Sequence, residues 1–182
     1  MKKQIIIAAL TIGAFVLGTT NTQAQTGTNS NSVKTTANLI LADVISIDSG
    51  AAVGGVVDFN YVTSSDYNSA KNVTVAESLV ITSSKNFDVK VKADGENFVN
   101  GANLIPVNVL QVKAVTGGTM VGTLNTITLS AADQKLVGNA TLGAKKSLSI
   151  DYSISAEKAS TVLLGKPAGT YTQKVTYTAT AL

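Results

Sequence analysis

Apolar residues recur at every second position over most of this 182-residue chain. The clearest stretch runs from Asn86 to Ala93, where every odd-numbered residue is apolar and Asp88, Lys90 and Lys92 stand between them. A strand with this period buries one face and presents the other to solvent. The same period is visible at residues 33–41, 57–61, 73–81, 148–154 and 170–180. The chain is therefore predicted to be all-β.

Turn signals separate these stretches. Asp94-Gly95 has the backbone freedom that a hairpin turn needs, and Gly117-Gly118 ends the long apolar run Leu104–Val115, whose inward set changes register near Val109. Seven to nine short strands with such breaks favour a single antiparallel immunoglobulin-like β-sandwich. One stretch departs from the period: Ser130–Gly138 is predicted to be a short helical turn, with a serine at its start and a glycine at its end.

The first 24 residues have the order of a secretory signal peptide. Lys2 and Lys3 precede an apolar run of roughly 14 residues, which is shorter than the ~20 needed to cross a bilayer. Cleavage is expected after Ala24, leaving a flexible polar tail at 25–32 and the sandwich domain at 33–182. The protein is thus expected to be secreted, to the periplasm, cell surface or extracellular space, with no transmembrane segment after cleavage.

The composition excludes most catalytic chemistry. The chain lacks Cys and His, and every one of its 14 basic residues is Lys. Thiol nucleophiles, imidazole bases, ordinary zinc sites and bidentate phosphate clamps are therefore absent. Without the two leader lysines, 12 Lys balance 11 acidic residues, so a nucleic-acid partner is not indicated. We expect no enzyme, cofactor or metal; Asp94–Asn97 carries oxygen ligands for calcium but lacks the alternating ladder of a dedicated loop.

The outward faces of the strands carry Thr, Ser and Asn in place of Lys and Glu. Such strands have high β-propensity and few charges to prevent edge pairing. We therefore predict an exported structural or surface subunit of a fimbria, coat or matrix. Its partners would be itself or other surface subunits, and it would assemble when an extended segment adds to an exposed sheet edge. The candidate added strand is Val33–Leu41, with Val33, Ala37, Leu39 and Leu41 among its alternating apolar residues; the sequence does not identify the acceptor edge.

An alternative is a monomeric module that binds cell-wall or extracellular glycan. The polar loop Ser64–Ser69 contains one aromatic residue, and loops on a rigid sandwich often carry function. The candidate contact residues in this loop are Ser64, Asp66, Tyr67 and Asn68.

The segment Leu164–Thr180 carries a Pro-Ala-Gly-Thr-Tyr turn followed by an alternating Thr-rich strand. It resembles the last hairpin of bacterial surface sandwiches: WxL cell-surface domains, spore coat protein U-like domains and fimbrial subunits. The strand Ser84–Val91 and the run Asp58-Phe59-Asn60 fit the same layout. Tyr177 stands where a WxL domain has the Trp of its terminal motif. The resemblance implies a sandwich in a surface setting and transfers no functional residue.

Overall fold

The structure is a computed structural model that describes residues 32–49 and 55–182. The predicted signal peptide at 1–24 and all but the last residue of the predicted tail at 25–32 lie outside the described residues. The chain divides into an N-terminal unit, of which 32–39 are described, and a second unit from residue 40 onward. No helix among the described residues is long and apolar enough to cross a membrane.

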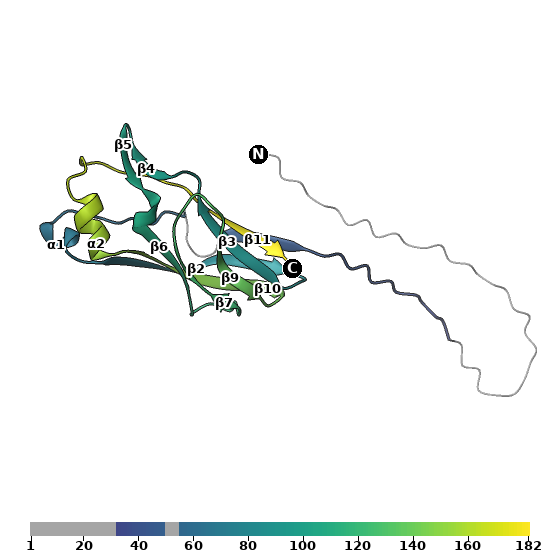
Figure 1. Cartoon of the computed structure of the whole chain (residues 1–182). Coiled ribbons are helices and arrows are strands. Elements are labelled where there is room, and N and C mark those ends of the chain that lie inside the picture. The colour runs from purple at the N-terminus through teal and green to yellow at the C-terminus, as the bar shows by residue number, and fades with distance from the viewer. Residues whose placement is uncertain (1–31, 50–54) are drawn as a thin grey trace, which may run out of the picture. The chain divides into compact units, whose positions relative to one another are not determined.

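The second unit is an antiparallel β-sandwich, as the alternation predicts (Figure 1). One sheet has the order β1-β2-β10-β6-β8, the other β11-β3-β9-β7, and β4-β5 form a separate hairpin. The first sheet contains β1 (Ile45–Ser49), β2 (Lys71–Ser83), β10 (Gly143–Ile154), β6 (Leu110–Val115) and β8 (Thr126–Thr128). The second contains β11 (Val175–Ala181), β3 (Phe87–Ala93), β9 (Gln134–Ala140) and β7 (Thr123–Leu124); the hairpin is β4 (Asn97–Asn100) and β5 (Asn103–Pro106).

The helical segments are short and lie between strands. They are α1 (Ser64–Tyr67), η1 (Val107–Val109), α2 (Ala156–Lys158) and η2 (Ala159–Leu163). The turn η1 separates β5 from β6, so the break predicted near Val109 is confirmed as a single 3-10 turn. The described residues form eleven strands, more than the predicted seven to nine, and two of these, β7 and β8, have only two and three residues.

The core lies between the two sheets and is made of the predicted inward residues. Phe87, Val89 and Val91 of β3 are completely buried, and they face Leu148 and Ile150 of β10 in the same cluster. Their outward neighbours Lys90 and Lys92 are only partly covered. The period-two pattern therefore places most of the buried side chains correctly.

The helical turn predicted at Ser130–Gly138 is wrong, because strand β9 begins at Gln134. Leu136 and Val137 are fully buried, and β9 pairs with β3 on one side and β7 on the other. Ser130 closes a local turn, its hydroxyl accepting from the N–H of Ala132 at 3.3 Å, and caps no helix. Burial and pairing with distant strands override the local cap signal.

Two further local predictions are wrong. The alternation over 148–154 predicts that Ser149, between Leu148 and Ile150, faces solvent. It is 3% exposed, because the β2–β10 ladder slips between Leu148 and Ile150. Its hydroxyl accepts from the N–H of Glu77 at 3.1 Å, and Glu77 has a φ of 48° at this bulge. The hairpin turn expected at Asp94-Gly95 only links β3 to β4; the β4–β5 turn contains Gly101, whose φ of 57° glycine adopts readily.

The strand predicted from Val33 is also absent: residues 32–44 form neither helix nor strand, and the first strand begins at Ile45. Residues 57–61 keep the predicted alternation without being a strand. Val57, Phe59 and Tyr61 pack half-buried on the core, while Asp58 and Asn60 are exposed. No backbone hydrogen bond joins 55–61 to another described segment.

Asp88 stabilises a bulge in β9. It points away from the core but is 7% exposed, because Lys135 and Asn139 cover it. Its carboxylate accepts from the N–H of Asn139 at 2.8 Å and pairs with Lys135 Nζ at 2.6 Å. Asn139 has a φ of 47°, so its N–H lies off the regular ladder. The Lys135 ammonium, followed by the Asn139 N–H, lowers the pKa of Asp88 below 3.8.

Replacement of Asp88 by Asn should reduce the free energy of unfolding at pH 7 by about 1–3 kcal/mol, since the charge-assisted bonds are lost. A carboxyl whose pKa is lower in the folded state adds stability above its unfolded pKa and loses it as pH falls through the folded pKa. The difference between wild type and Asp88→Asn should therefore shrink below about pH 4. Denaturant titrations across pH measure this; a constant difference would contradict it.

Leu136→Ala should reduce the free energy of unfolding by about 2–5 kcal/mol, because it opens a cavity between the sheets. Leu104, 45% exposed on the β4–β5 hairpin, is the matched control. Leu104→Ala should cost less than about 1 kcal/mol. Equal losses in urea unfolding would mean that the core lies elsewhere.

Candidate functional site

The sandwich has two flanks, and one is closed by the chain itself. Between β7 and β8 a single residue, Asn125, crosses from one sheet to the other. Its N–H donates to Leu136 O in β9, and its carbonyl accepts from the N–H of Ala114 in β6. The two strands at this flank are also too short to present a long row of free peptide groups.

The opposite flank is open and is formed by β1 and β11, which lie close together. β11 pairs only with β3, and its outer edge pairs with no described segment. Its sequence, VTYTATA, contains no charge, no proline and no glycine. Natural edge strands are normally protected by such residues, by bulges or by a covering segment. β11 has seven residues and is the longest outer strand of either sheet. It contains neither a charge nor a proline and has no bulge.

The register fixes which peptide groups of β11 point outward. Leu182 donates to Asn86 O at 2.8 Å, and Asp94 donates to Lys174 O at 3.0 Å. In an antiparallel pair, residues that bond to the neighbour alternate with residues that do not. The even-numbered residues of β11 therefore bond to β3. The N–H and C=O groups directed to the open edge belong to Val175, Tyr177, Ala179 and Ala181.

The same four residues also point their side chains toward the core, yet they are incompletely covered. Val175, Tyr177 and Ala179 are half-buried, and Ala181 is exposed. Their direct partners in β3 are 1% exposed or less: Ala93, Val91, Val89 and Phe87, respectively. The burial of the inward side chains therefore falls sharply from β3 to its neighbour β11. On the facing edge, Ile45 of β1 is 38% exposed. Apolar surface coincides along this open edge, Val175–Ala181, with peptide groups that have no partner among the described residues.

Tyr177 joins the two sheets beneath the open edge. Its hydroxyl and that of Tyr152 in β10 lie 2.6 Å apart, and burial raises the pKa of both groups. Both hydroxyls are therefore neutral at physiological pH, and the hydrogen bond holds β11 at a set distance from the opposite sheet.

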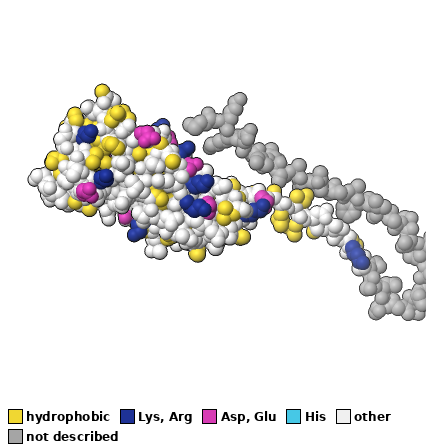
Figure 2. All heavy atoms as spheres, viewed as in Figure 1, with side chains coloured by type: hydrophobic (Ala, Val, Ile, Leu, Met, Phe, Trp, Pro, Cys, Tyr) yellow, Lys and Arg dark blue, Asp and Glu magenta, His cyan; other side chains and the backbone are white. Residues whose placement is uncertain are grey.

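The predicted assembly residues Val33, Ala37, Leu39 and Leu41 lie in the segment before β1. All four are exposed, Leu39 at 90% and Leu41 at 89%. Figure 2 shows apolar side chains standing out on the part of this segment that leads into β1. A water-exposed run of large apolar residues is uncommon in a monomeric protein unless a partner covers it.

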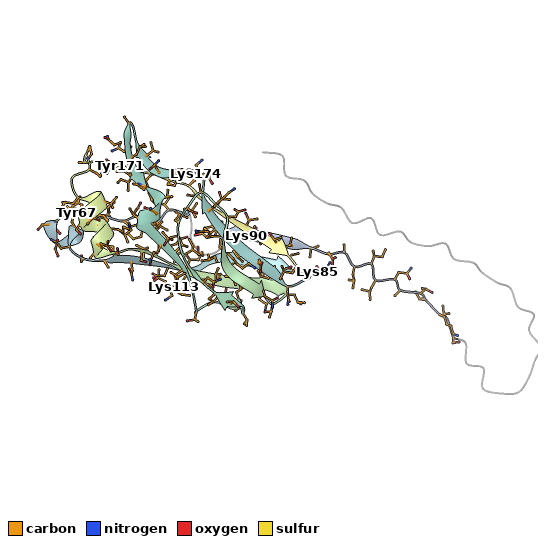
Figure 3. The ribbon with its side chains drawn as sticks, viewed as in Figure 1. Tyr67, Lys85, Lys90, Lys113, Tyr171 and Lys174 are labelled. Carbon is orange, nitrogen blue, oxygen red and sulfur yellow. The ribbon has the colours of Figure 1, made fainter. Side chains whose placement is uncertain are left out.

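The predicted contact loop forms the one-turn helix α1. Thr63 and Asp66 cap it reciprocally, and Asp66 also pairs with Lys71 at 2.7 Å. The ring of Tyr67 packs against Tyr61 with 5.2 Å between centroids. Ser64 and Asn68 are exposed, with the Asn68 amide donating to Ser64 O. Figure 3 places Tyr67 and Lys85 at opposite ends of the sandwich, so this loop and the turn between β2 and β3 are separate features.

The surface hollows gather few ionisable groups. One is lined by residues 58–60 and 70–73, and contains Asp58 and Lys71. The other lies beside the start of α2 and contains Glu157 and Lys158. Within residues 32–49 and 55–182, no three acidic side chains converge as they would around a metal ion.

Comparison with known proteins assigns no family. No protein-family model matches the chain, and no curated protein matches it.

The amides of Val175, Tyr177, Ala179 and Ala181 should exchange with solvent deuterium faster than those of Thr176, Thr178 and Thr180 in the monomeric protein. The first group points to the open edge and the second is bonded to β3. Residue-resolved hydrogen exchange by NMR measures the pattern. Uniform protection along the strand would show that another segment covers the edge.

Proposed function

We propose that this protein is an exported, non-enzymatic structural subunit that polymerises by strand addition. The open edge of β11 receives Val33–Leu41 from a second copy. The observation that supports this most directly is that one uncharged strand combines half-buried inward side chains with peptide groups that no described segment pairs. An added strand supplies partners for both at once.

The candidate donor matches the edge in length and pattern. Val33–Leu41 has nine residues and β11 has seven. One face of the donor carries Val33, Thr35, Ala37, Leu39 and Leu41. When this face is turned to the core, it extends the apolar row formed by Val175, Tyr177 and Ala179. The donor itself has no acidic residue and one lysine, Lys34, which then faces solvent.

The energetics favour a stable joint. Burial of one large aliphatic side chain contributes about 1.5–3 kcal/mol, and each backbone hydrogen bond about 0.5–1.5 kcal/mol. Three such side chains and several ladder bonds exceed the lower range of the association cost, about 4–15 kcal/mol. A subunit joint of this kind should dissociate slowly.

Glycan binding has less support. The ring of Tyr67 packs on Tyr61 and does not form a free platform for a sugar, and Asp66 is engaged with Lys71 and with the N-cap of α1. Strand addition gives a role to the exposed apolar segment Val33–Leu41 and to the open edge Val175–Ala181. Glycan binding gives a role to neither.

Leu39→Asp should abolish or strongly weaken polymerisation, because it places a charge on the donor face that meets the core. Ile40→Asp is the matched control. Ile40 is 94% exposed and adjacent, but it lies on the other face of the donor, so this variant should assemble. Both side chains are exposed in the monomer, so neither change should alter its stability by more than about 0.5 kcal/mol.

The measurement is the size of native protein recovered from cells or medium, run unboiled and boiled. Wild type and Ile40→Asp should give a high-mass ladder that collapses to the subunit on boiling, and Leu39→Asp should give the subunit in both lanes. A wild-type monomer in both lanes would falsify the polymer proposal, and glycan pull-downs would then take precedence.

A further inference from the structure

The residues just before β1 are fixed to the turn between β2 and β3. The N–H of Val44 donates to Ser84 Oγ at 2.9 Å, and the N–H of Ser84 donates to Val44 O at 2.9 Å. Asp43 pairs with Lys85 Nζ at 2.5 Å, and this contact lowers the pKa of Asp43. We call this group of contacts the root clamp: Asp43 and Val44 held by Ser84 and Lys85.

The same turn also binds the end of β11. Asn86 O accepts from the N–H of Leu182, and Asn86 Oδ1 accepts from Leu142 at 3.1 Å. β1 therefore starts, and β11 finishes, at the end of the sandwich where Lys85 lies (Figure 3). The candidate donor is attached where the acceptor strand of the same copy ends.

This arrangement sets the direction of any pairing within one copy. A segment that precedes β1 and lies along β11 of its own chain must run toward the root clamp, as β11 does. The pairing would then be parallel, which is slightly less stable per residue than antiparallel pairing. The connection would also have to pass from β1, at the edge of one sheet, to the outer side of β11 in the other sheet.

The root clamp leaves almost no chain for that connection. Asp43 and Val44 are engaged, so Ala42 is the one residue between Leu41 and the clamp. A looser turn would have to use Leu39, Ile40 and Leu41, and the pairing would lose the largest apolar side chains of the donor. Even the tightest common hairpin connection between two antiparallel segments has two residues.

We infer that the donor cannot complete its own sandwich and that a second copy must receive it, with Ala42 as the only free residue in the joint between successive subunits. This inference rests on the proposed function. The partner is another copy of this chain, joined head to tail. Because the root clamp belongs to one subunit and the edge to the next, the clamp also limits how far neighbouring subunits can turn against each other.

The test lengthens the joint and leaves both surfaces intact. Insertion of about eight Gly and Ser residues between Leu41 and Ala42 spans ~16 Å on average, enough to let the donor reach β11 of its own copy. The same insertion between Ser32 and Val33 is the matched control, because it lengthens the chain outside the joint. Full-length wild type, both insertion variants and Leu39→Asp are compared by light scattering after size exclusion and by urea unfolding.

The expected result is that wild type and the control polymerise, whereas the joint insertion gives monomers that unfold at higher urea than Leu39→Asp. If the joint insertion gave polymers of the same size as those of wild type, the inference would be overturned and the proposed function would stand. A wild-type monomer that Leu39→Asp destabilises would also overturn it, since the donor would then act within its own copy. A wild-type monomer that Leu39→Asp leaves unchanged would refute the proposed function, and the inference with it.

Discussion

The outer strands of a β-sandwich have to be covered or protected, because each has a hydrogen-bonded neighbour on one side only. In this protein one flank is closed by the crossing at Asn125, which bonds to both sheets. The other flank ends in β11, and the interior beneath it is less well covered than under any other long strand of that sheet. The core is formed from both sheets, yet its coverage is asymmetric. The proposed strand addition depends on that asymmetry.

The irregular positions inside the sheets are satisfied by short polar side chains. Ser149 accepts the N–H of Glu77 at one bulge, and Asp88 accepts the N–H of Asn139 at another. Glu77 and Asn139 both have positive φ, which places their amides off the regular ladder. Bulges therefore cost little here, since each displaced donor has a neighbouring oxygen. β11, by contrast, is regular along its whole pairing with β3.

Alternation in the sequence was sufficient to predict the sheet class and most of the core. Phe87, Val89 and Val91 occupy the interior as their period predicts. It failed where distant strands decide the outcome. Ser130–Gly138 has the local signals of a capped helical turn, but β9 begins within it and is held by β3 and β7, and Ser149 is turned inward by a register slip. The alternation in Val33–Leu41 was enough to propose this segment as a donor. It could not identify the acceptor, because edge position depends on the order of strands in a sheet, and a period of two contains no such information.

The hydroxyl pair between Tyr152 and Tyr177 has an optical consequence. The chain has five tyrosines and no tryptophan, so its near-ultraviolet emission comes from tyrosine alone. One of these rings, Tyr177, stands in the row of side chains that an added strand would cover, and its hydroxyl is already bonded across the core. A change in covering at the edge alters the surroundings of an intrinsic chromophore that is otherwise rigidly held. In the proposed assembly, tyrosine emission would therefore report occupancy of the edge without an added label.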